Sequence, residues 1–263
     1  MNPNLLIVVA RAPDTGTTKT RLGATIGADR ACALYRAFLA DVAHRFTPQL
    51  GMDPGYDFAW GYTPAEADFR GTIAAVSGRP NDDTTIFVTQ VGDTLNDRLT
   101  KLFRWGFDRG HQRVAIMASD SPQLPLRAAT EAFSSLGRND VTIGRVADGG
   151  YYLVGLSRFS DLLIDLPMST SGAADAVAGR AHLLALRFGE ITPSFDVDEA
   201  SDLRLLYAAL APDGAAAPAT WTALHRLGLV IHESHSSGED MADQAAFADD
   251  EIASATRCRS RLP

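Results

Sequence analysis

The stretch IVVARAPDTGTTKTRLGA, Ile7 to Ala24, decides the fold of this chain. It leads from an apolar segment typical of a buried strand into a polar loop rich in threonine. Along the chain, short apolar segments of this kind alternate with longer segments whose apolar residues recur at helical spacing. Because apolar runs such as VAIMAS are continuous, these strands are expected to be buried on both faces. The pattern predicts an α/β fold, a three-layer α/β/α sandwich around a mostly parallel mixed sheet.

The second half of the chain is expected to reverse the direction of a strand. The predicted strands span residues 5–10, 56–62, 86–90, 113–118, 141–146 and 151–156. The predicted helices span residues 28–46, 95–107, 173–186, 199–210 and 220–227. Only the polar corner ADGG separates the last two strands, so these should pair antiparallel. We predict one domain over residues 1–231, followed by a polar, poorly ordered tail at 232–263.

Composition and charge restrict the partners of the chain. With 263 residues and a net charge of −8, it lacks the basic patch that binding to nucleic acid or to an anionic membrane needs. No apolar run approaches the roughly 20 residues that cross a bilayer, and no signal peptide precedes the two distant cysteines, Cys32 and Cys258. A cytoplasmic protein that binds small molecules is therefore expected. The alanine-rich face near Ala208–Leu210 would suit packing against a second copy, in a homo-oligomer, or against the chain's own sheet.

The loop that follows the first strand is expected to bind phosphate groups. In open α/β sheets, ligands bind beyond the carboxyl ends of the strands, where free backbone N–H groups point outward. Gly16 would let the backbone approach an anion, while Arg11, Lys19 and Arg21 supply positive charge. Two threonines separate the glycine from the lysine, so this is not a Walker A loop, and it contains no GxGxxG motif.

Lys19 is unusual for this chain, because only two of its 24 basic residues are lysines. The other is Lys101. Since arginine is the default cation here, lysine at position 19 indicates a site that needs a compact ammonium group rather than a planar guanidinium. The alternative is a solvated loop lysine.

Two acidic motifs are candidates for a divalent cation site. Asp120 follows a predicted buried strand in MASDSPQLP, where prolines stop regular structure. Asp196 and Asp198 flank Val197, so in an extended segment both carboxylates face one side. Carboxylates in such places suit Mg²⁺ or Mn²⁺ bound to phosphate oxygens. The alternative is helix capping, by Asp120 at a following turn and by Asp198 with Asp202 ahead of the next helix.

The segment ADGGYYLVGL is a candidate for binding a second substrate. Gly149 and Gly150 allow a sharp turn with close backbone approach, and Asp148 adds a carboxylate. Tyr151 or Tyr152 could stack on a substrate or border it. A plain hairpin is the alternative, since its sequence would be similar.

Together these motifs resemble the DUF2064 family of GT-A-like transferases, relatives of the MobA and CofC nucleotidyltransferases. The first loop matches as RAPDTGTTKTRL, followed in the family's order by GDTLNDRL, ASDSPQLP, DGGYYLVGL, MSTSG and DVDEASDL. The resemblance covers residues 5–210 and implies a Rossmann-like GT-A fold, that of the nucleotide-diphospho-sugar transferases. Arg145 and Met168 depart from the family, which has a proline and an aromatic residue there, and both flank the predicted acceptor side.

The resemblance also implies roles for individual residues. The predicted nucleotide-binding set is Ala10, Arg11, Gly16, Lys19, Arg21 and Ser119. The predicted metal ligands are Asp120 with Asp196 or Asp198. The predicted acceptor-binding set is Asp148, Gly149, Gly150, Tyr151, Ser169 and Thr170. Lys19, Arg21 and Asp120 would be the catalytic residues, because they neutralise the phosphates and hold the cation.

We expect a metal-dependent nucleotidyltransferase-like enzyme, in which a phosphate- or phosphonate-bearing acceptor attacks the α-phosphate of a nucleoside triphosphate and releases pyrophosphate. Two cations within three positions, Lys19 and Arg21, favour a triphosphate over a diphosphate. The first alternative is a glycosyltransferase that uses a nucleotide-sugar donor, with Asp148 as the nearest candidate for a base. The second alternative is a nucleotide-binding protein without catalytic activity.

Overall fold

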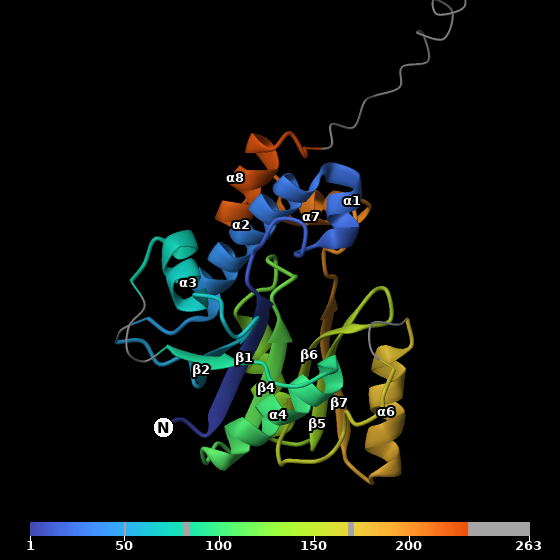
Figure 1. The fold of residues 1–263 in the computed structure, drawn as a ribbon. Helices are drawn as coiled ribbons and strands as arrows, with labels where there is room; N and C mark the ends of the chain where they lie inside the picture. The colour runs from blue at the N-terminus through green and yellow to red at the C-terminus, as the bar shows by residue number, and fades with distance from the viewer. Residues whose placement is uncertain (50, 81–84, 168–170, 231–263) are drawn as a thin grey trace, which may run out of the picture. The chain divides into compact units, whose positions relative to one another are not determined.

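The sheet of the computed structural model has the strand order β3-β2-β1-β4-β6-β5-β7 (Figure 1). The structure describes residues 1–49, 51–80, 85–167 and 171–230. The strands are β1 (Asn4–Arg11), β2 (Asp57–Thr63), β3 (Ile86–Thr89), β4 (Arg113–Ala118), β5 (Val141–Val146), β6 (Tyr151–Leu156) and β7 (Phe188–Ser194). β1 pairs in parallel with β2 and β4, β2 with β3, and β5 with β7, whereas β6 is antiparallel to both of its neighbours. The sheet is therefore mixed and mostly parallel, as predicted.

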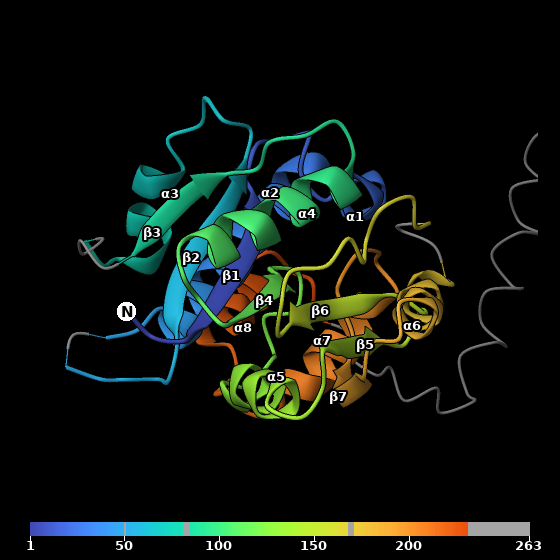
Figure 2. The same cartoon turned by 90° about the horizontal axis from the view of Figure 1, so that it is seen from below.

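Helices cover both faces of this sheet. They are α1 (Thr20–Ile26), α2 (Ala28–Phe46), α3 (Phe69–Ser77), α4 (Leu95–Asp108), α5 (Arg127–Leu136), α6 (Ala173–Leu183), α7 (Asp202–Leu210) and α8 (Pro218–Arg226). In Figure 2, α4 lies on one face of the sheet and α5 on the other. This arrangement confirms the predicted three-layer α/β/α sandwich.

Alternate residues of each strand supply the two faces of the core. Ile7 of β1 lies in one buried cluster with Phe103 of α4 and Val177 of α6. On the opposite face, Trp60 of β2 packs edge-on against Phe69 of α3, with ring centroids 5.6 Å apart. Because both faces are covered by helices, the strands need apolar residues at consecutive positions, which explains their continuous apolar runs.

The topology brings several distant segments to one edge of the sheet. The first four strands are parallel, so the loops that follow β1, β2, β3 and β4 leave from the same edge. Because β6 runs the opposite way, the turn between β5 and β6 lies at this edge, as does the segment after β7. Every acidic or basic motif singled out in the sequence therefore lies at, or next to, this edge.

Some elements differ from the sequence prediction. The prediction did not include α1, α3, α5 or β7. Residues of β7 are exposed or half-buried, so the segment FGEITPS lacks the apolar run by which the other strands are recognised. α7 begins at Asp202 rather than at residue 199, because the Asp202 carboxylate accepts hydrogen bonds from the N–H groups of Asp198 and Glu199 and holds that segment as a turn.

Residues Met1–Val230 form one compact unit. The predicted tail at 232–263 lies outside the described residues, so the division into domain and tail stays a prediction. None of the described helices combines the length and the apolar character that a membrane span requires. In the segment for which packing against a second copy was considered, Leu210 is buried within the chain and Ala208 is exposed.

Candidate functional site

The loop after β1 is held in place by its own hydrogen bonds. Oγ1 of the buried Thr18 donates to the carbonyl oxygen of Ala12 and accepts from the N–H of Asp14, both at 3.1 Å. Lys19 follows with a φ of 51°, in the left-handed region that residues other than glycine seldom adopt. Because this conformation is costly, the loop and the contacts of the lysine side chain must together hold it.

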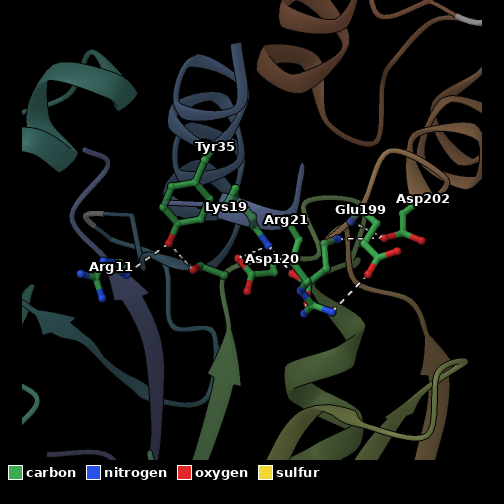
Figure 3. A network of polar contacts seen from close by, with 9 residues as sticks. Arg11, Lys19, Arg21, Tyr35, Asp120, Glu199 and Asp202 are labelled. Carbon is green, nitrogen blue, oxygen red and sulfur yellow. Dashed lines mark hydrogen bonds and ion pairs between the residues drawn. The ribbon is translucent and has the colours of Figure 1, made fainter. Parts of the chain in front are cut away.

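Lys19 lies between two carboxylates (Figure 3). Its Nζ atom is 2.9 Å from Oδ1 of Asp120 and 2.8 Å from Oδ1 of Asp198, and its side chain is only 6% exposed. Burial alone would lower the pKa of this ammonium group, but the two carboxylates outweigh burial and raise the pKa above its ordinary value. Lys19 is therefore a buried, charged residue and not a solvated loop lysine.

One backbone hydrogen bond joins the two acidic motifs. The N–H of Val197 donates to the carbonyl oxygen of Asp120 at 3.1 Å, and the Val197 side chain is fully buried. Asp196 and Asp198, on either side of it, both line a cavity. This arrangement agrees with the predicted alternation, which places the two carboxylates on one side of the segment.

Arg21 and Asp202 fix the position of the segment after β7. Nη2 of Arg21 donates to Oδ2 of Asp198, and its Nη1 donates to Oε1 of Glu199 at 3.4 Å (Figure 3). The Asp202 carboxylate accepts the N–H groups of Asp198 and Glu199 at 2.9 and 2.7 Å. Asp202 therefore holds the turn ahead of α7 without capping that helix, whereas the Asp198 carboxylate binds cationic side chains.

Asp196 differs from Asp120 and Asp198 in that no cationic side chain of the described residues pairs with it. Among the described residues it has no hydrogen bond or ion pair from its side chain. Burial, together with the negative charges of Asp198 and Asp148, raises the pKa of Asp196 to about 6. Burial would also raise the pKa of Asp198, but Lys19 and Arg21 outweigh it and lower that pKa. A further cation at this place would therefore find Asp196 without a partner.

Two cavities at this edge of the sheet share part of their lining. The loop cavity, of about 390 Å³, has four cationic and two acidic side chains among its described residues: Arg11, Lys19, Arg21, Arg98, Asp120 and Asp198. The hairpin cavity, of about 550 Å³, has one cationic and six acidic side chains among its described residues: Arg21, Asp120, Asp148, Asp196, Asp198, Glu199 and Asp202. Both volumes fall within the range of small-molecule sites, roughly 300–1,000 Å³.

The predicted nucleotide-binding residues gather around the loop cavity. Five of the six line it: Ala10, Arg11, Lys19, Arg21 and Ser119. Gly16 lines neither cavity and instead permits the turn of the loop, with a φ of 83°. The Ser119 hydroxyl is 2.8 Å from the hydroxyl of Tyr35, which also accepts the N–H of Arg11 at 3.2 Å. The Ser119 side chain therefore supports the end of β1 from within.

The predicted acceptor-binding residues are divided. Asp148, Gly150 and Tyr151 line the hairpin cavity. Gly149 does not line it but is required by the turn, since its φ is 90° and a Cβ atom there would lie 1.9 Å from the carbonyl oxygen of Ser171. The turn is therefore seated against the segment before α6 and is more than a plain hairpin. Two further predicted residues, Ser169 and Thr170, lie outside the described residues.

Of the two residues that depart from the family pattern, the structure describes only Arg145. Met168 lies outside the described residues. Arg145 does not line the hairpin cavity, and it forms ion pairs with Asp175 at 2.8 Å and with Glu190 at 2.9 Å. Arg145 therefore links β5 to β7 and to α6.

The structure adds residues that the sequence analysis did not single out. These residues are Gln90 and Arg98, which line the loop cavity. Tyr152, which the sequence analysis considered together with Tyr151, lines the hairpin cavity. The Gln90 side chain donates to the carbonyl oxygens of Ala10 and Gly61 at 3.2 and 2.8 Å, so it links the ends of β1 and β2. Arg98 belongs to the segment GDTLNDRL, which was quoted for the resemblance without a role for any of its residues.

No group of three histidine, cysteine or acidic side chains within the described part of the chain is arranged to hold a metal ion. The predicted ligands Asp120, Asp196 and Asp198 nevertheless line one cavity. Two of them converge on a single point, which Lys19 occupies with its ammonium group. The site thus has carboxylate oxygens of the kind that bind a cation, but two of these carboxylates pair with the ammonium group of Lys19.

Comparison with known proteins finds a family model that matches part of the chain. Residues 66–170 match the model of the family described as "Uncharacterized protein conserved in bacteria (DUF2064)". The match includes the segments GDTLNDRL, ASDSPQLP and DGGYYLVGL and confirms the resemblance found in the sequence. The comparison with curated proteins returned no match.

Two of the solved structures similar to this chain are described as enzymes. One, from Desulfovibrio desulfuricans G20 and provisionally described as a nucleotide-diphospho-sugar transferase, is 26% identical, with 86% of this chain and 97% of that chain covered and a TM-score of 0.74. A second, 4-diphosphocytidyl-2C-methyl-D-erythritol synthase from Anaerococcus prevotii DSM 20548, is 10% identical, with 80% and 98% covered and a TM-score of 0.50. The second likeness bears on the fold alone. Together they confirm the predicted fold class, that of the nucleotide-diphospho-sugar transferases.

Proposed function

We propose that the chain is a nucleotide-dependent transferase, in which the loop cavity binds a nucleotide donor and the hairpin cavity binds a small acceptor. The observation that carries this proposal is the lining shared by the cationic and the acidic cavity, which includes Asp120 and Asp198, the two carboxylates that pair with Lys19 of the loop cavity. Transfer requires donor and acceptor to meet at one point with their charges held in place. The description of the similar structure from Desulfovibrio desulfuricans G20 supports the same class of reaction.

The residues at this point fit a divalent cation. Asp120 and Asp198 direct oxygens to one position that already holds a positive charge, and Asp196 lies in the same cavity without a cationic partner among the described residues. Oxygen ligands of this kind are those that Mg²⁺ and Mn²⁺ prefer. Such an ion would neutralise charge that develops on the phosphate groups of the donor.

The chain's own residues have distinct tasks in this scheme. Lys19 would exchange its two carboxylate partners for donor phosphate groups on binding of the donor, because Asp120 and Asp198 would then hold the cation. Arg21 keeps the segment after β7 in place through Asp198 and Glu199. No covalent step on the protein is needed, so positioning and neutralisation of charge are its contribution.

Nucleotidyl transfer from a nucleoside triphosphate is the first candidate reaction. Four cationic side chains line the loop cavity, which suits a ligand with the charge of a triphosphate. In this reaction the acceptor attacks the α-phosphate and pyrophosphate leaves.

Glycosyl transfer from a nucleotide sugar is the second candidate, and the charge of the hairpin cavity favours it. The described lining of that cavity offers a phosphate-bearing acceptor only Arg21 as a cation, and Arg21 already pairs with two carboxylates. An acceptor hydroxyl avoids this repulsion, and Asp148, with one oxygen bound to the N–H of Gly150 at 2.9 Å, lies in the same lining as a candidate base.

A thermal-shift panel tests the proposal. The wild type would be melted with the four common triphosphates and with nucleotide sugars, with and without Mg²⁺ or Mn²⁺. A ligand at 100 times its Kd stabilises by about 2.7 kcal/mol, which raises the Tm by roughly 2–4 °C per kcal/mol in a domain of this size. The metal-dependent shift should be lost in Asp120→Asn and kept in Asp108→Asn, an exposed aspartate on α4.

The products decide between the two reactions. Release of pyrophosphate from a triphosphate would identify nucleotidyl transfer, and release of a nucleoside diphosphate from a nucleotide sugar would identify glycosyl transfer. Binding of nucleotide that Mg²⁺ and Mn²⁺ do not strengthen, with neither product formed, would contradict the proposal and favour a binding protein without catalytic activity.

A further inference from the structure

Arg98 is a cation whose side chain has no partner in the described part of the structure. It lies in the first turn of α4 and lines the loop cavity. Its Nε atom is buried and has no hydrogen-bond acceptor, and no ion pair joins its guanidinium to an acidic residue among the described residues. A buried donor without an acceptor costs free energy in the folded protein, so its retention calls for an explanation.

Two other cations of the loop cavity already have partners. Lys19 binds Asp120 and Asp198, and the exposed Arg21 binds Asp198 and Glu199. Arg11 also has no carboxylate partner among the described residues, but it is exposed. Of the cations in this lining, Arg98 is thus the half-buried one that can take a ligand without first giving up a carboxylate.

The position of Arg98 on α4 indicates which part of a donor it would reach. Leu95, one turn earlier, lines both cavities, and the next residue, Leu99, lines the hairpin cavity. This side of α4 therefore borders the point where the two cavities meet. The donor's phosphate groups must lie at that point, since the bond to be broken is there, whereas the nucleoside extends away from it.

We infer that Arg98 binds the diphosphate part of the donor, as a guanidinium that donates to phosphate oxygens from α4 while Lys19 approaches from the first loop. This inference rests on the proposed function, because it takes the loop cavity to be the donor site. A planar guanidinium can donate two parallel hydrogen bonds to one phosphate group, which an ammonium cannot do. The ligand chemistry is a nucleoside di- or triphosphate rather than a nucleoside or a monophosphate.

Binding measurements on a matched set of ligands test this role. Calorimetric titrations would use the triphosphate that gives the largest thermal shift, its diphosphate, its monophosphate and inorganic pyrophosphate, all with Mg²⁺. The variants are Arg98→Gln, Arg98→Lys and the control Arg104→Gln, a residue on the same helix whose side chain is 57% exposed and lines neither cavity.

We expect Arg98→Gln to weaken binding of the triphosphate, the diphosphate and pyrophosphate by about 10- to 100-fold, the range for a lost hydrogen bond to a charged group. Binding of the monophosphate should change less than about threefold. The affinity of Arg98→Lys should lie between those of the wild type and Arg98→Gln, because lysine keeps the positive charge but cannot donate two parallel hydrogen bonds. Arg104→Gln should bind every ligand as the wild type does.

Three outcomes would overturn the inference. The first is an equal loss for all three nucleotides, which would indicate a contact with the base or ribose. The second is no loss in Arg98→Gln beyond that of the control, and the third is wild-type affinity in a folded Arg98→Lys when Arg98→Gln does not fold. Titration with pyrophosphate distinguishes failure of this inference from failure of the proposed function. If the wild type binds pyrophosphate but no nucleotide, the proposed function fails. Loss of pyrophosphate binding in Arg98→Gln would still support a contact between Arg98 and a diphosphate.

Discussion

The two cavities lie side by side at one edge of the sheet and differ in the sign of their charge. The cationic side chains of the loop cavity come from the end of β1, from the loop after it, from the start of α1 and from α4. The acidic side chains of the hairpin cavity come from the end of β4, from the turn between β5 and β6, and from the segment after β7. The charges at this edge thus come from different chain segments, and Lys19 lies on the border, because it lines the loop cavity and pairs with two carboxylates that line both cavities.

The largest expected effect comes from removing this border residue. In Lys19→Met, we expect the rate of transfer to fall by about 100- to 1,000-fold, as when one preorganised donor to a charged transition state is lost. Binding of Mn²⁺ to the ligand-free protein should become tighter, because the ammonium group no longer competes for Asp120 and Asp198. Steady-state kinetics and calorimetric titration with Mn²⁺ measure the two effects.

The control for this variant is the other lysine of the chain. Lys101→Met changes a half-exposed side chain that pairs with Asp97 on α4, and it should alter neither the rate nor the affinity for Mn²⁺. Unchanged turnover in a folded Lys19→Met protein would remove Lys19 from the catalytic residues.

A second, smaller effect should appear in the turn beside the hairpin cavity. Gly149→Ala places a Cβ atom 1.9 Å from the Ser171 carbonyl oxygen at a φ of 90°, so the turn must move. We expect a loss of about 2 kcal/mol in the free energy of unfolding, typical of strain at a special backbone position. Urea denaturation measures it.

Gly179→Ala is the matched control, since a Cβ atom at that position in α6 would meet nothing within 4 Å. It should stabilise the protein by about 0.5–1 kcal/mol through helix propensity. Equal stability of the two variants would mean that the turn adapts and that the hairpin cavity is not held by Gly149.

A third effect concerns Asp196 in the hairpin cavity and depends on pH. The pKa of Asp196 in the folded protein is about 6, above its ordinary value of 3.8, so folding takes up a proton between these values. The free energy of unfolding of the wild type should therefore fall as pH rises from about 4 to about 6. Asp196→Asn removes this loss, so metal-free Asp196→Asn should be more stable than the wild type at pH 7 and equal to it at pH 4.

We expect this difference to stay below about 1 kcal/mol, because solvent screens the partly exposed carboxylate. Thermal melts of the chelator-treated proteins from pH 4 to pH 8 measure it. A difference that is constant over this range would show that the charge of Asp196 is already compensated.

A fourth effect, of similar size, concerns Tyr152, which lines the hairpin cavity without adding charge to it. Its hydroxyl donates to the carbonyl oxygen of Thr192 in β7 at 2.8 Å, and Gly144 leaves room for its ring. Tyr152→Phe should cost about 1 kcal/mol in the free energy of unfolding, the usual value of one hydrogen bond, with donor affinity unchanged. A change in donor affinity would show that the two cavities are less separate than their linings indicate.

The sequence predicts the fold where apolar runs are continuous and predicts it poorly where they are not. The bounds of β4, β5, β6 and α2 agree with the prediction, because these segments are buried and their periodicity is clear. β7 was not predicted, since it forms the edge of the sheet and most of its residues face solvent or are half-buried. β7 therefore needs its partner strand before its pattern can be recognised, whereas β3, at the opposite edge, was predicted from its apolar residues.

In the candidate site, too, some features can be predicted from the sequence and others cannot. That Lys19, Asp120 and the aspartates after β7 approach one another follows from motifs at strand ends, which the topology brings to one edge. That Lys19 pairs with two of these carboxylates could not be predicted, because it depends on where β7 joins the sheet. Arg98 was missed because helical periodicity indicates which face of α4 is apolar but not which residue at its start borders a cavity.

The hydrogen bond between Val197 and Asp120 has a consequence for the order of assembly. The segment that carries Asp196 and Asp198 follows β7, the last strand of the sheet in the chain. During synthesis, the loop after β1 and the end of β4 therefore emerge long before the carboxylates that complete the border between the two cavities. Until Val197 docks on Asp120, Lys19 has only one of its two partners, so the ability to hold a donor and a cation together comes late in folding, as a property of the finished sheet.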